Sequence, residues 1–247
     1  MTALSVNLNK LALLRNSRGR NYPDLQHYAR RFIELGVQGI TVHPRPDERH
    51  IRRQDALELA ELLKDFPEVE YNIEGYPSED FLELVSKCRP RQCTLVPDAA
   101  DQLTSDHGWD FTQQLENLKP IIARLKQQDI RVAVFLDPDP LQAELAARSG
   151  ADRIELYTED FASTFGTPQG REVFGNYLKT AGCAQELGLG VNAGHDLNLE
   201  NLPDFLSIPD ILEVSIGHAL TIESIDQGMD HVVKRYLEIC QAANTGN

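Results

Sequence analysis

Residues 39–74 read GITVHPRPDERHIRRQDALELAELLKDFPEVEYNIE and contain one strand–helix–strand unit. The first four residues, Gly39 to Val42, are a short apolar run typical of a buried strand. Gln54 to Phe66 then carry alanine and leucine at helical spacing, and Val69 to Ile73 form a second apolar run. This order predicts two parallel strands joined by a right-handed helical crossover.

The same alternation runs through the whole chain of 247 residues. It predicts eight strands, each followed by a helical pattern: Ala3 to Val6, Gly39 to Val42, Val69 to Ile73, Gln92 to Val96, Arg131 to Leu136, Arg153 to Ile154, Gly190 to Val191 and Val214 to Ile216. Eight such units in this length favour an α/β fold of the closed (β/α)₈ type, the TIM barrel, as a single domain over residues 1–247. An open doubly wound sheet usually has a glycine-rich nucleotide loop after its first strand, and this chain has Asn7-Leu-Asn-Lys10 there.

The segments between strands give further expectations. Asp98 to Trp109 and Tyr157 to Gly170 are polar stretches that predict long loops, and Ile222 to Ala243 predicts one last helix. Thr221 is a plausible N-cap for that helix.

Composition limits the possible partners and compartment. The formal net charge is −14, which argues against a surface for nucleic acid or anionic membranes. The chain has no apolar run of about 18 residues, which predicts no membrane span, and Met1 to Lys10 show no signal peptide. The four cysteines lack metal-ligand spacing and fit a reducing compartment, so we expect a cytoplasmic protein.

Polar residues gather where the predicted strands end. They are Asn7, His43, Glu74, Glu155, His195 and the pair Gly217-His218. The carboxyl ends of barrel strands converge on one mouth, where the chemistry of such enzymes takes place. Histidine titrates near neutrality, and a desolvated glutamate has a raised pKa, so these residue types predict acid–base catalysis.

Two basic clusters suggest an anion site in this acidic chain. They span Arg15 to Arg20, which includes Arg18, and His43 to His50, which includes Arg45. Both follow predicted strands, where a phosphate ester could bind, although a solvated charge run is the alternative. The Gly217-His218 turn lies where barrels commonly bind phosphate.

A metal centre is the competing interpretation of the same side chains. His43, Glu74, His195 and His218 are residue types that can bind zinc or iron. The chain has no His-x-His or His-x-x-x-His pair, so we expect no metal.

Several motifs together resemble those of pyridoxine 5'-phosphate synthase, and the resemblance covers nearly the whole chain. The motifs are Leu14-Arg-Asn-Ser-Arg-Gly19, Gly39-Ile-Thr-Val-His-Pro-Arg45 with Arg49-His50, Leu95-Val-Pro97, Val191-Asn-Ala-Gly-His195 and Ile216-Gly-His218. The resemblance implies a (β/α)₈ barrel with extra helices that assembles as a homo-octamer and needs no metal or cofactor. It also implies condensation of 1-deoxy-D-xylulose 5-phosphate with 3-amino-2-oxopropyl phosphate to pyridoxine 5'-phosphate, with release of phosphate and water.

The resemblance assigns roles to individual residues. It implies that His43 and Glu74 are bases, that His195 is the acid and that Glu155 stabilises the transition state. The substrate contacts that we expect are Asn7, Asn9, Lys10, Arg18, Arg45, His50, Thr104, Asp196, Gly217 and His218.

The chain departs from the family pattern in three places. Asn9-Lys10 stands where Asp-His is common, Ala99-Ala100 where many members have Lys-Arg, and Asp196 where glycine is usual. These departures concern the binding of the amine substrate. A non-catalytic sugar-phosphate-binding barrel and a metal-dependent barrel hydrolase are the alternative functions.

Overall fold

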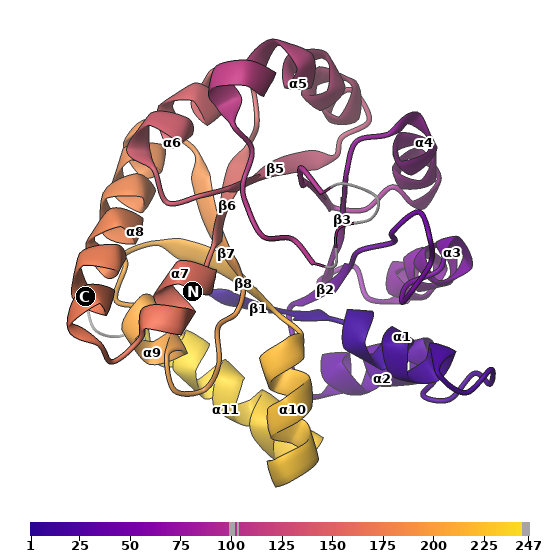
Figure 1. Ribbon diagram of the computed structural model, residues 1–247. Coiled ribbons are helices and arrows are strands. Elements are labelled where there is room, and N and C mark those ends of the chain that lie inside the picture. The colour runs from indigo at the N-terminus through magenta and orange to yellow at the C-terminus, as the bar shows by residue number, and fades with distance from the viewer. Residues whose placement is uncertain (99–101, 103, 244–247) are drawn as a thin grey trace.

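The computed structural model describes residues 1–98, 102 and 104–243. All eight strands are parallel, each pairs with its neighbours in chain order, and β8 pairs with β1 to close the barrel (Figure 1). The strands are β1 (Ala3–Asn7), β2 (Gly39–Val42), β3 (Glu70–Gly75), β4 (Gln92–Leu95), β5 (Arg131–Leu136), β6 (Arg153–Tyr157), β7 (Gly190–His195) and β8 (Ile211–Ile216). The predicted (β/α)₈ barrel is therefore confirmed.

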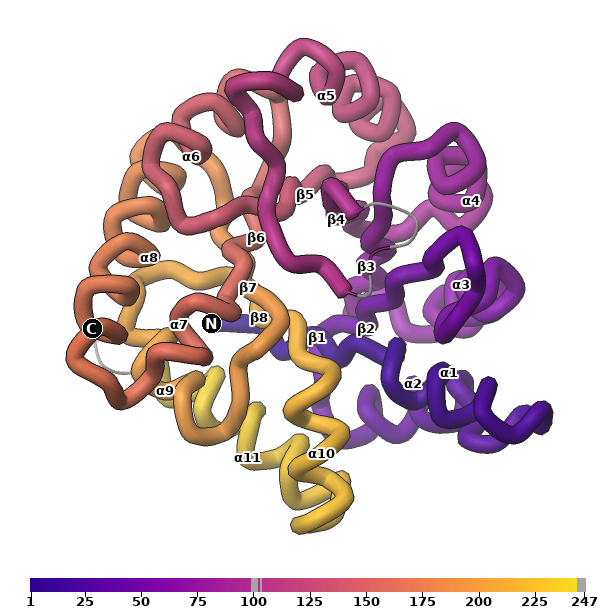
Figure 2. Tube along the Cα trace, in the orientation of Figure 1, coloured from indigo at the N-terminus to yellow at the C-terminus, as the bar shows by residue number. Residues whose placement is uncertain are grey.

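Helices form a ring around the barrel (Figure 2). Those of the described residues are α1 (Asn9–Asn16), α2 (Leu25–Glu34), α3 (Arg53–Leu62), the 3₁₀ helix η1 (Leu63–Asp65), α4 (Glu79–Cys88), α5 (Phe111–Lys126), α6 (Pro140–Ala147), α7 (Glu159–Thr164), α8 (Pro168–Glu186), α9 (Leu202–Phe205), α10 (His218–Gln227) and α11 (Met229–Ala242). Several crossovers thus carry a second helix, as the resemblance implied.

Alternate residues of the strands divide between two environments. Leu4, Val6 and Ile40 are fully or almost fully buried and belong to the apolar core under the helices. Several residues that alternate with these are polar and bond between neighbouring strands, as in the 2.7 Å bond between the hydroxyl groups of Ser5 and Thr41. Branched apolar side chains dominate most barrels of this type, so a polar interior is a distinctive property of this one.

This polar interior forms a chain of hydrogen bonds between strands. The Thr94 hydroxyl is 3.1 Å from Asn72 Oδ1 and 3.4 Å from Glu155 Oε2. Nearer the amino ends of the strands, Gln92 Nε2 donates to Glu213 Oε1 at 3.3 Å. The barrel therefore buries several ionisable groups, and burial shifts their pKa values.

Several local predictions were wrong. Residues 157–170, predicted as a loop, contain α7, and α1 was not predicted at all. The helix predicted from Ile222 to Ala243 is two helices, α10 and α11, because the chain turns at Gly228 with φ of 87°. Gly217, not Thr221, caps α10, and the Thr221 hydroxyl instead donates to the Gly217 carbonyl oxygen at 2.8 Å.

Strand ends also differ from the prediction. Glu74, Glu155 and His195 lie within β3, β6 and β7, which are longer than their apolar runs. The apolar runs ended early because the inward-facing residues of this barrel are polar, and hydrophobicity alone cannot detect such residues as strand.

Candidate active site

His43 and Glu74 lie together at the barrel mouth. His43 directly follows β2, and its Nδ1 is 4.0 Å from Glu74 Oε2. Two asparagines position the pair: the side chain of Asn7 donates to Glu74 Oε2 at 3.5 Å, and Asn9 Oδ1 accepts the backbone N–H of His43 at 3.0 Å. Both His43 and Glu74 are buried, with 6% and 9% of their surface exposed.

Burial shifts the proton affinities of these two groups in opposite directions. The pKa of Glu74 is raised well above its ordinary value by burial and then by the nearby carboxylates of Glu155 and Glu213. The pKa of His43 is lowered well below its ordinary value by burial and then by the positive charge of Arg45. At neutral pH His43 is therefore an uncharged imidazole that can accept a proton.

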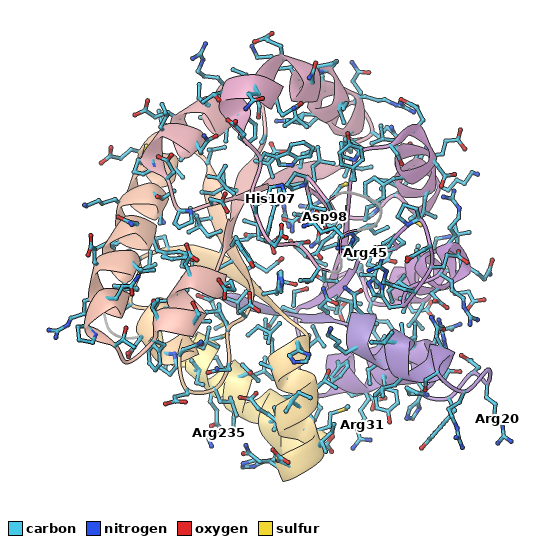
Figure 3. All side chains as sticks on the ribbon, viewed as in Figure 1. Arg20, Arg31, Arg45, Asp98, His107 and Arg235 are labelled. Atoms are coloured by element: carbon cyan, nitrogen blue, oxygen red, sulfur yellow. The ribbon has the colours of Figure 1, made fainter. Side chains whose placement is uncertain are left out.

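Arg45 lies beside this pair, buried and fixed by two acceptors. Its guanidinium forms an ion pair with Asp98, and its Nη1 donates to the Gln102 carbonyl oxygen at 2.8 Å. Figure 3 shows the labelled Arg45 and Asp98 close together toward the centre of the molecule. Asp98 was not among the predicted site residues, although it follows β4 closely, as other mouth residues follow their strands.

A pocket of about 540 Å³ opens beside these groups. His43, Arg45 and Asp98 form part of its wall, and Tyr76 and Phe81 add aromatic surface. Glu48, Arg53 and Asp80 add further charged groups to the wall, so this concave site suits a small polar ligand.

Glu155 lies deeper, inside the barrel. It is 2% exposed, and its pKa is raised to about 8 by burial and then by the carboxylate of Glu213. A Cβ at position 194 would lie 2.5 Å from Glu155 Oε1. Glycine at this position of β7 therefore leaves the space that the Glu155 carboxyl group occupies.

His195 ends β7 and presents its ring to the mouth. The ring is stacked with Phe135, with centroids 6.1 Å apart and planes at 18°, and Tyr157 packs against it at 5.7 Å. Burial lowers the pKa of His195, and the carboxylate of Asp196, 3.8 Å from its Nε2, opposes this shift. The side chain keeps 29% of its surface exposed, so a ligand in the mouth can reach it.

The residues that directly follow β7 and β8 contact neighbouring parts of the barrel. The backbone N–H of Asp196 donates to the Thr158 hydroxyl at 3.0 Å, and Asp196 Oδ2 is buried without a hydrogen-bond partner among the described residues. At the end of β8, a Cβ at position 217 would lie 3.0 Å from both the Cβ and the carbonyl oxygen of Asn7. Gly217 therefore allows close contact between β8 and β1, and His218 starts α10 with an exposed side chain.

The arginines of the first basic cluster lie in two different environments. Arg15 is buried and forms a bidentate ion pair with Asp55, with Nη–Oδ distances of 2.5 and 2.7 Å, so it joins α1 to α3. Arg18 follows the end of α1 and is exposed, and the labelled Arg20 lies at the edge of the molecule (Figure 3). The structure thus does not bring Arg18 to the pair of His43 and Glu74.

The remaining predicted substrate contacts are His50, Lys10 and Thr104. The ring of His50 lies 6.3 Å from that of His43, and burial followed by the charge of Arg45 lowers the pKa of His50 to about 4. Lys10 is half-buried, and its charge also lowers the pKa of both His50 and His195. Thr104 is exposed, and Ala99-Ala100 lie outside the described residues.

The part of the chain that the structure describes contains no group of three or more His, Cys, Asp or Glu side chains placed to hold a metal ion. The described residues also include no helix with the length and apolar character needed to cross a bilayer.

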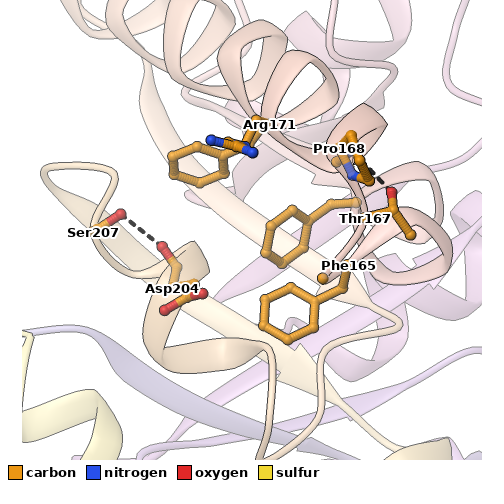
Figure 4. Close-up of a pocket in the computed structure, with 10 residues that line it drawn as sticks. Phe165, Thr167, Pro168, Arg171, Asp204 and Ser207 are labelled. Carbon is orange, nitrogen blue, oxygen red and sulfur yellow. Dashed lines mark hydrogen bonds between the residues drawn. The ribbon is translucent and has the colours of Figure 1, made fainter.

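A second pocket, of about 460 Å³, lies outside the barrel (Figure 4). The start of α8 and α9 border it, with Phe165, Arg171 and Asp204 in its wall. None of the predicted site residues belongs to this pocket, so it does not share the chemistry of the mouth.

Residues 4–242 match the family described as pyridoxal phosphate biosynthesis protein PdxJ. A pyridoxine 5'-phosphate synthase of Flavobacterium johnsoniae is 51% identical over 241 residues, which cover 96% of this chain and 99% of that protein. The proteins of the same name from Brucella anthropi and Agrobacterium fabrum are 50% and 48% identical. These alignments cover 95% and 98% of this chain, and 97% and 98% of those proteins.

Solved structures of distant proteins share the fold. Phosphoribosyl anthranilate isomerase from Thermotoga maritima superposes with a TM-score of 0.60 at 12% identity, covering 98% of this chain and 100% of that one. 3-Hexulose-6-phosphate synthase from Salmonella typhimurium gives a TM-score of 0.66 at 12% identity, with the same coverage.

Proposed function

The chain belongs to the family of the pyridoxal phosphate biosynthesis protein PdxJ, and from this membership and its mouth we infer that it is an enzyme that makes pyridoxine 5'-phosphate. It condenses 1-deoxy-D-xylulose 5-phosphate with 3-amino-2-oxopropyl phosphate and releases phosphate and water. We propose that the one barrel is the complete catalytic unit.

The observation that best supports a role in this chemistry is the buried pair of His43 and Glu74. Imine formation, enolisation, loss of phosphate and ring closure each move a proton, so the enzyme needs groups that both accept and donate protons. The uncharged His43 can accept one, and a Glu74 with a raised pKa is, once ionised, a stronger base than an ordinary carboxylate. We assign these two as bases.

His195 is the proposed acid. Its ring is fixed by Phe135 and Tyr157, and its exposed edge faces the mouth. Asp196 favours the protonated ring, which is the form that donates a proton to a leaving hydroxyl group. Glu155, buried between β4 and β7, is the proposed group that stabilises the transition state.

Two phosphorylated substrates need two anion sites. We place one at Arg45, with Arg18 and His50 as further contacts, and the other where β8 leads into α10 at Gly217 and His218. Asn7, Asn9, Lys10, Thr104 and Asp196 are the remaining proposed substrate contacts. Asn9 Oδ1 accepts the backbone N–H of His43. The asparagine, which stands where aspartate is usual in the family, therefore holds the proposed base His43 in place without adding a negative charge.

Purified protein incubated with both substrates tests the function directly. We expect pyridoxine 5'-phosphate and inorganic phosphate to appear in equal amounts, with unchanged rates after treatment with a chelator. Rates that fall with the chelator would favour a metal-dependent hydrolase. Binding of one sugar phosphate without product would favour a non-catalytic barrel.

The assembly and compartment are also proposals. The family resemblance supports a homo-octamer, and the composition of the chain supports a cytoplasmic protein that binds neither nucleic acid nor membrane. Light scattering should give the mass of eight chains at micromolar concentration, and a mass of one or two chains would contradict the octamer.

A further inference from the structure

Asp98 is a buried carboxylate at the mouth with three polar neighbours. It follows Pro97 and is 4% exposed. Its Oδ2 pairs with the Arg45 guanidinium, accepts a hydrogen bond from the Ser105 hydroxyl at 2.7 Å and lies 4.0 Å from His43 Nε2. A charged group this deeply buried needs compensation, which Arg45 supplies in this structure.

The two oxygens of Asp98 are used unequally. All three neighbours lie around Oδ2, whereas Oδ1 is buried and has no hydrogen-bond partner among the described residues. A buried carboxylate with an unused oxygen is incompletely satisfied, so it can gain from a new donor.

Two negatively charged groups, Asp98 and a substrate phosphate, compete for the Arg45 guanidinium. In the proposed function Arg45 binds a substrate phosphate, yet here its guanidinium is paired with Asp98. A phosphate dianion carries more charge than a carboxylate and binds arginine strongly, so it can weaken the pair between Arg45 and Asp98. The negative charge of Asp98 then needs another partner.

His43 is the neighbour that can become that partner. Its ring lies between two carboxyl groups, with Nδ1 4.0 Å from Glu74 and Nε2 4.0 Å from Asp98. When His43 accepts a proton from the substrate, both ring nitrogens carry hydrogen and each faces a carboxyl oxygen. The Asp98 carboxylate thus stabilises the imidazolium from the Nε2 side, and Glu74 does so from the Nδ1 side when it is ionised.

We propose that Asp98 is a positioning residue that couples phosphate binding at Arg45 to protonation of His43. Without substrate, Asp98 neutralises Arg45. With phosphate on Arg45, Asp98 becomes the counter-ion of the protonated base. The inference rests on the proposed function, because it needs Arg45 to bind phosphate and His43 to act as a base.

The charged groups around His43 fix the direction of the effect. Besides burial, positive charge on Arg45, His50, His195 and Arg49 lowers the pKa of His43. The carboxyl groups that face its ring are Glu74 from β3 and Asp98 after β4. Phosphate at Arg45 cancels part of the lowering influence and frees Asp98, so phosphate should raise the pKa of His43.

A first test compares phosphate binding with turnover in Asp98→Asn. The neutral amide keeps the shape but removes the competitor for Arg45, so inorganic phosphate should bind several-fold more tightly. Turnover should fall by about 10- to 100-fold because protonated His43 loses its counter-ion. Asp98→Glu should restore part of the turnover. Asp106→Asn, in the same segment but exposed, is the matched control and should change neither quantity. Weaker phosphate binding together with slower turnover would indicate a merely structural role and contradict the proposal.

A second test does not require turnover. The chain has seven histidines, so protein labelled with ¹³C at histidine Cε1 can be titrated by NMR, with His43→Gln used to assign His43. Saturating inorganic phosphate should raise the pKa of His43 by about one unit or more in the wild type, and by much less in Asp98→Asn.

The two tests separate this inference from the proposed function. A pKa shift in a protein that makes no pyridoxine 5'-phosphate would keep the coupling and refute the activity. Normal synthesis with no phosphate-dependent change at His43 would refute the coupling. Because the wild type alone gives this answer, the test stands even if Asp98→Asn does not fold.

Discussion

The two sides of the barrel mouth are built differently. On the β2–β4 side, defined by His43, Arg45, Glu74 and Asp98, every group is buried and close to another member. On the β6–β8 side, defined by His195, Asp196, Gly217 and His218, both histidines retain exposed surface. The first side is preorganised for proton transfer, and the second keeps its groups accessible to a ligand.

This difference between the two sides allows one mouth to hold both bases and an acid. Burial favours the uncharged forms of both Glu74 and His43 on the first side. At His195 the carboxylates of Asp196 and then Asp98 oppose the lowering of the pKa by burial. Different surroundings of similar side chains therefore produce different proton affinities within one site.

Glu74→Gln should have the largest effect, because it removes a proposed base from the buried side. We expect kcat to fall by on the order of 10⁴-fold with the fold intact, measured as product formation and by circular dichroism. Glu79→Gln, which replaces an exposed glutamate on α4, is the control and should keep full activity. Near-normal turnover in Glu74→Gln would remove Glu74 from its assigned role.

His195→Ala tests the more exposed side. We expect kcat to fall by about 10²- to 10³-fold, because water in the open mouth can replace part of the lost acid. Stability should change little, since the ring is partly exposed. A loss equal to that of Glu74→Gln would show that the two sides do not differ in access to water.

Glu155 should make stability depend on pH. Its folded pKa of about 8 lies above the ordinary value of 4.5, so the folded protein holds an extra proton between these values. The stability that this proton provides is complete below about pH 4.5 and is lost as pH rises through about 8. From pH 5 to 9, Glu155→Gln should therefore gain on the order of a few kcal/mol in unfolding free energy relative to wild type.

Denaturant unfolding at fixed protein concentration measures this difference. Glu74 and Glu213 also have raised pKa values, and the Glu155 carboxylate contributes to that of Glu74, so the comparison measures Glu155 together with its coupling to these neighbours. Parallel stability curves for the two proteins would contradict a raised pKa of Glu155.

Gly194→Ala tests the space between β6 and β7. The new Cβ would lie 2.5 Å from Glu155 Oε1, so the carboxyl group must move, at a cost of about 1–3 kcal/mol in stability and with slower turnover. Gly175→Ala on α8 is the matched control. It meets no atom within 4 Å and should be neutral or stabilising by about 0.5–1 kcal/mol. Equal melting temperatures for the two variants would exclude crowding at Glu155.

Arg18→Ala should have the smallest effect. Arg18 is exposed and distant from the pair of His43 and Glu74 in this structure, so we expect KM to rise by about tenfold with little change in kcat. Steady-state kinetics with each substrate varied in turn would show which phosphate Arg18 contacts. An unchanged KM for both substrates would remove Arg18 from the site.

Much of the site was predictable because strand ends of a parallel barrel converge. The positions of His43, Glu74 and His195 along the chain were sufficient to predict a shared mouth. Asp98 was missed, although its place after β4 is the same signal, because the polar stretch from Asp98 to Trp109 was interpreted as a loop. Arg15 and Arg18 could not be told apart in sequence, since only packing shows that Arg15 pairs with Asp55.

The sequence by itself determined the barrel, the family and the residue types at the mouth, because periodicity and ordered motifs are local properties of the chain. Only the tertiary structure decided which charges are paired and which are desolvated. Asp98 meets Arg45 across 53 positions of sequence, and Glu155 meets Thr94 across 61. Proton affinity depends on burial and on neighbours brought together by folding, and neither is present in the linear order of residues.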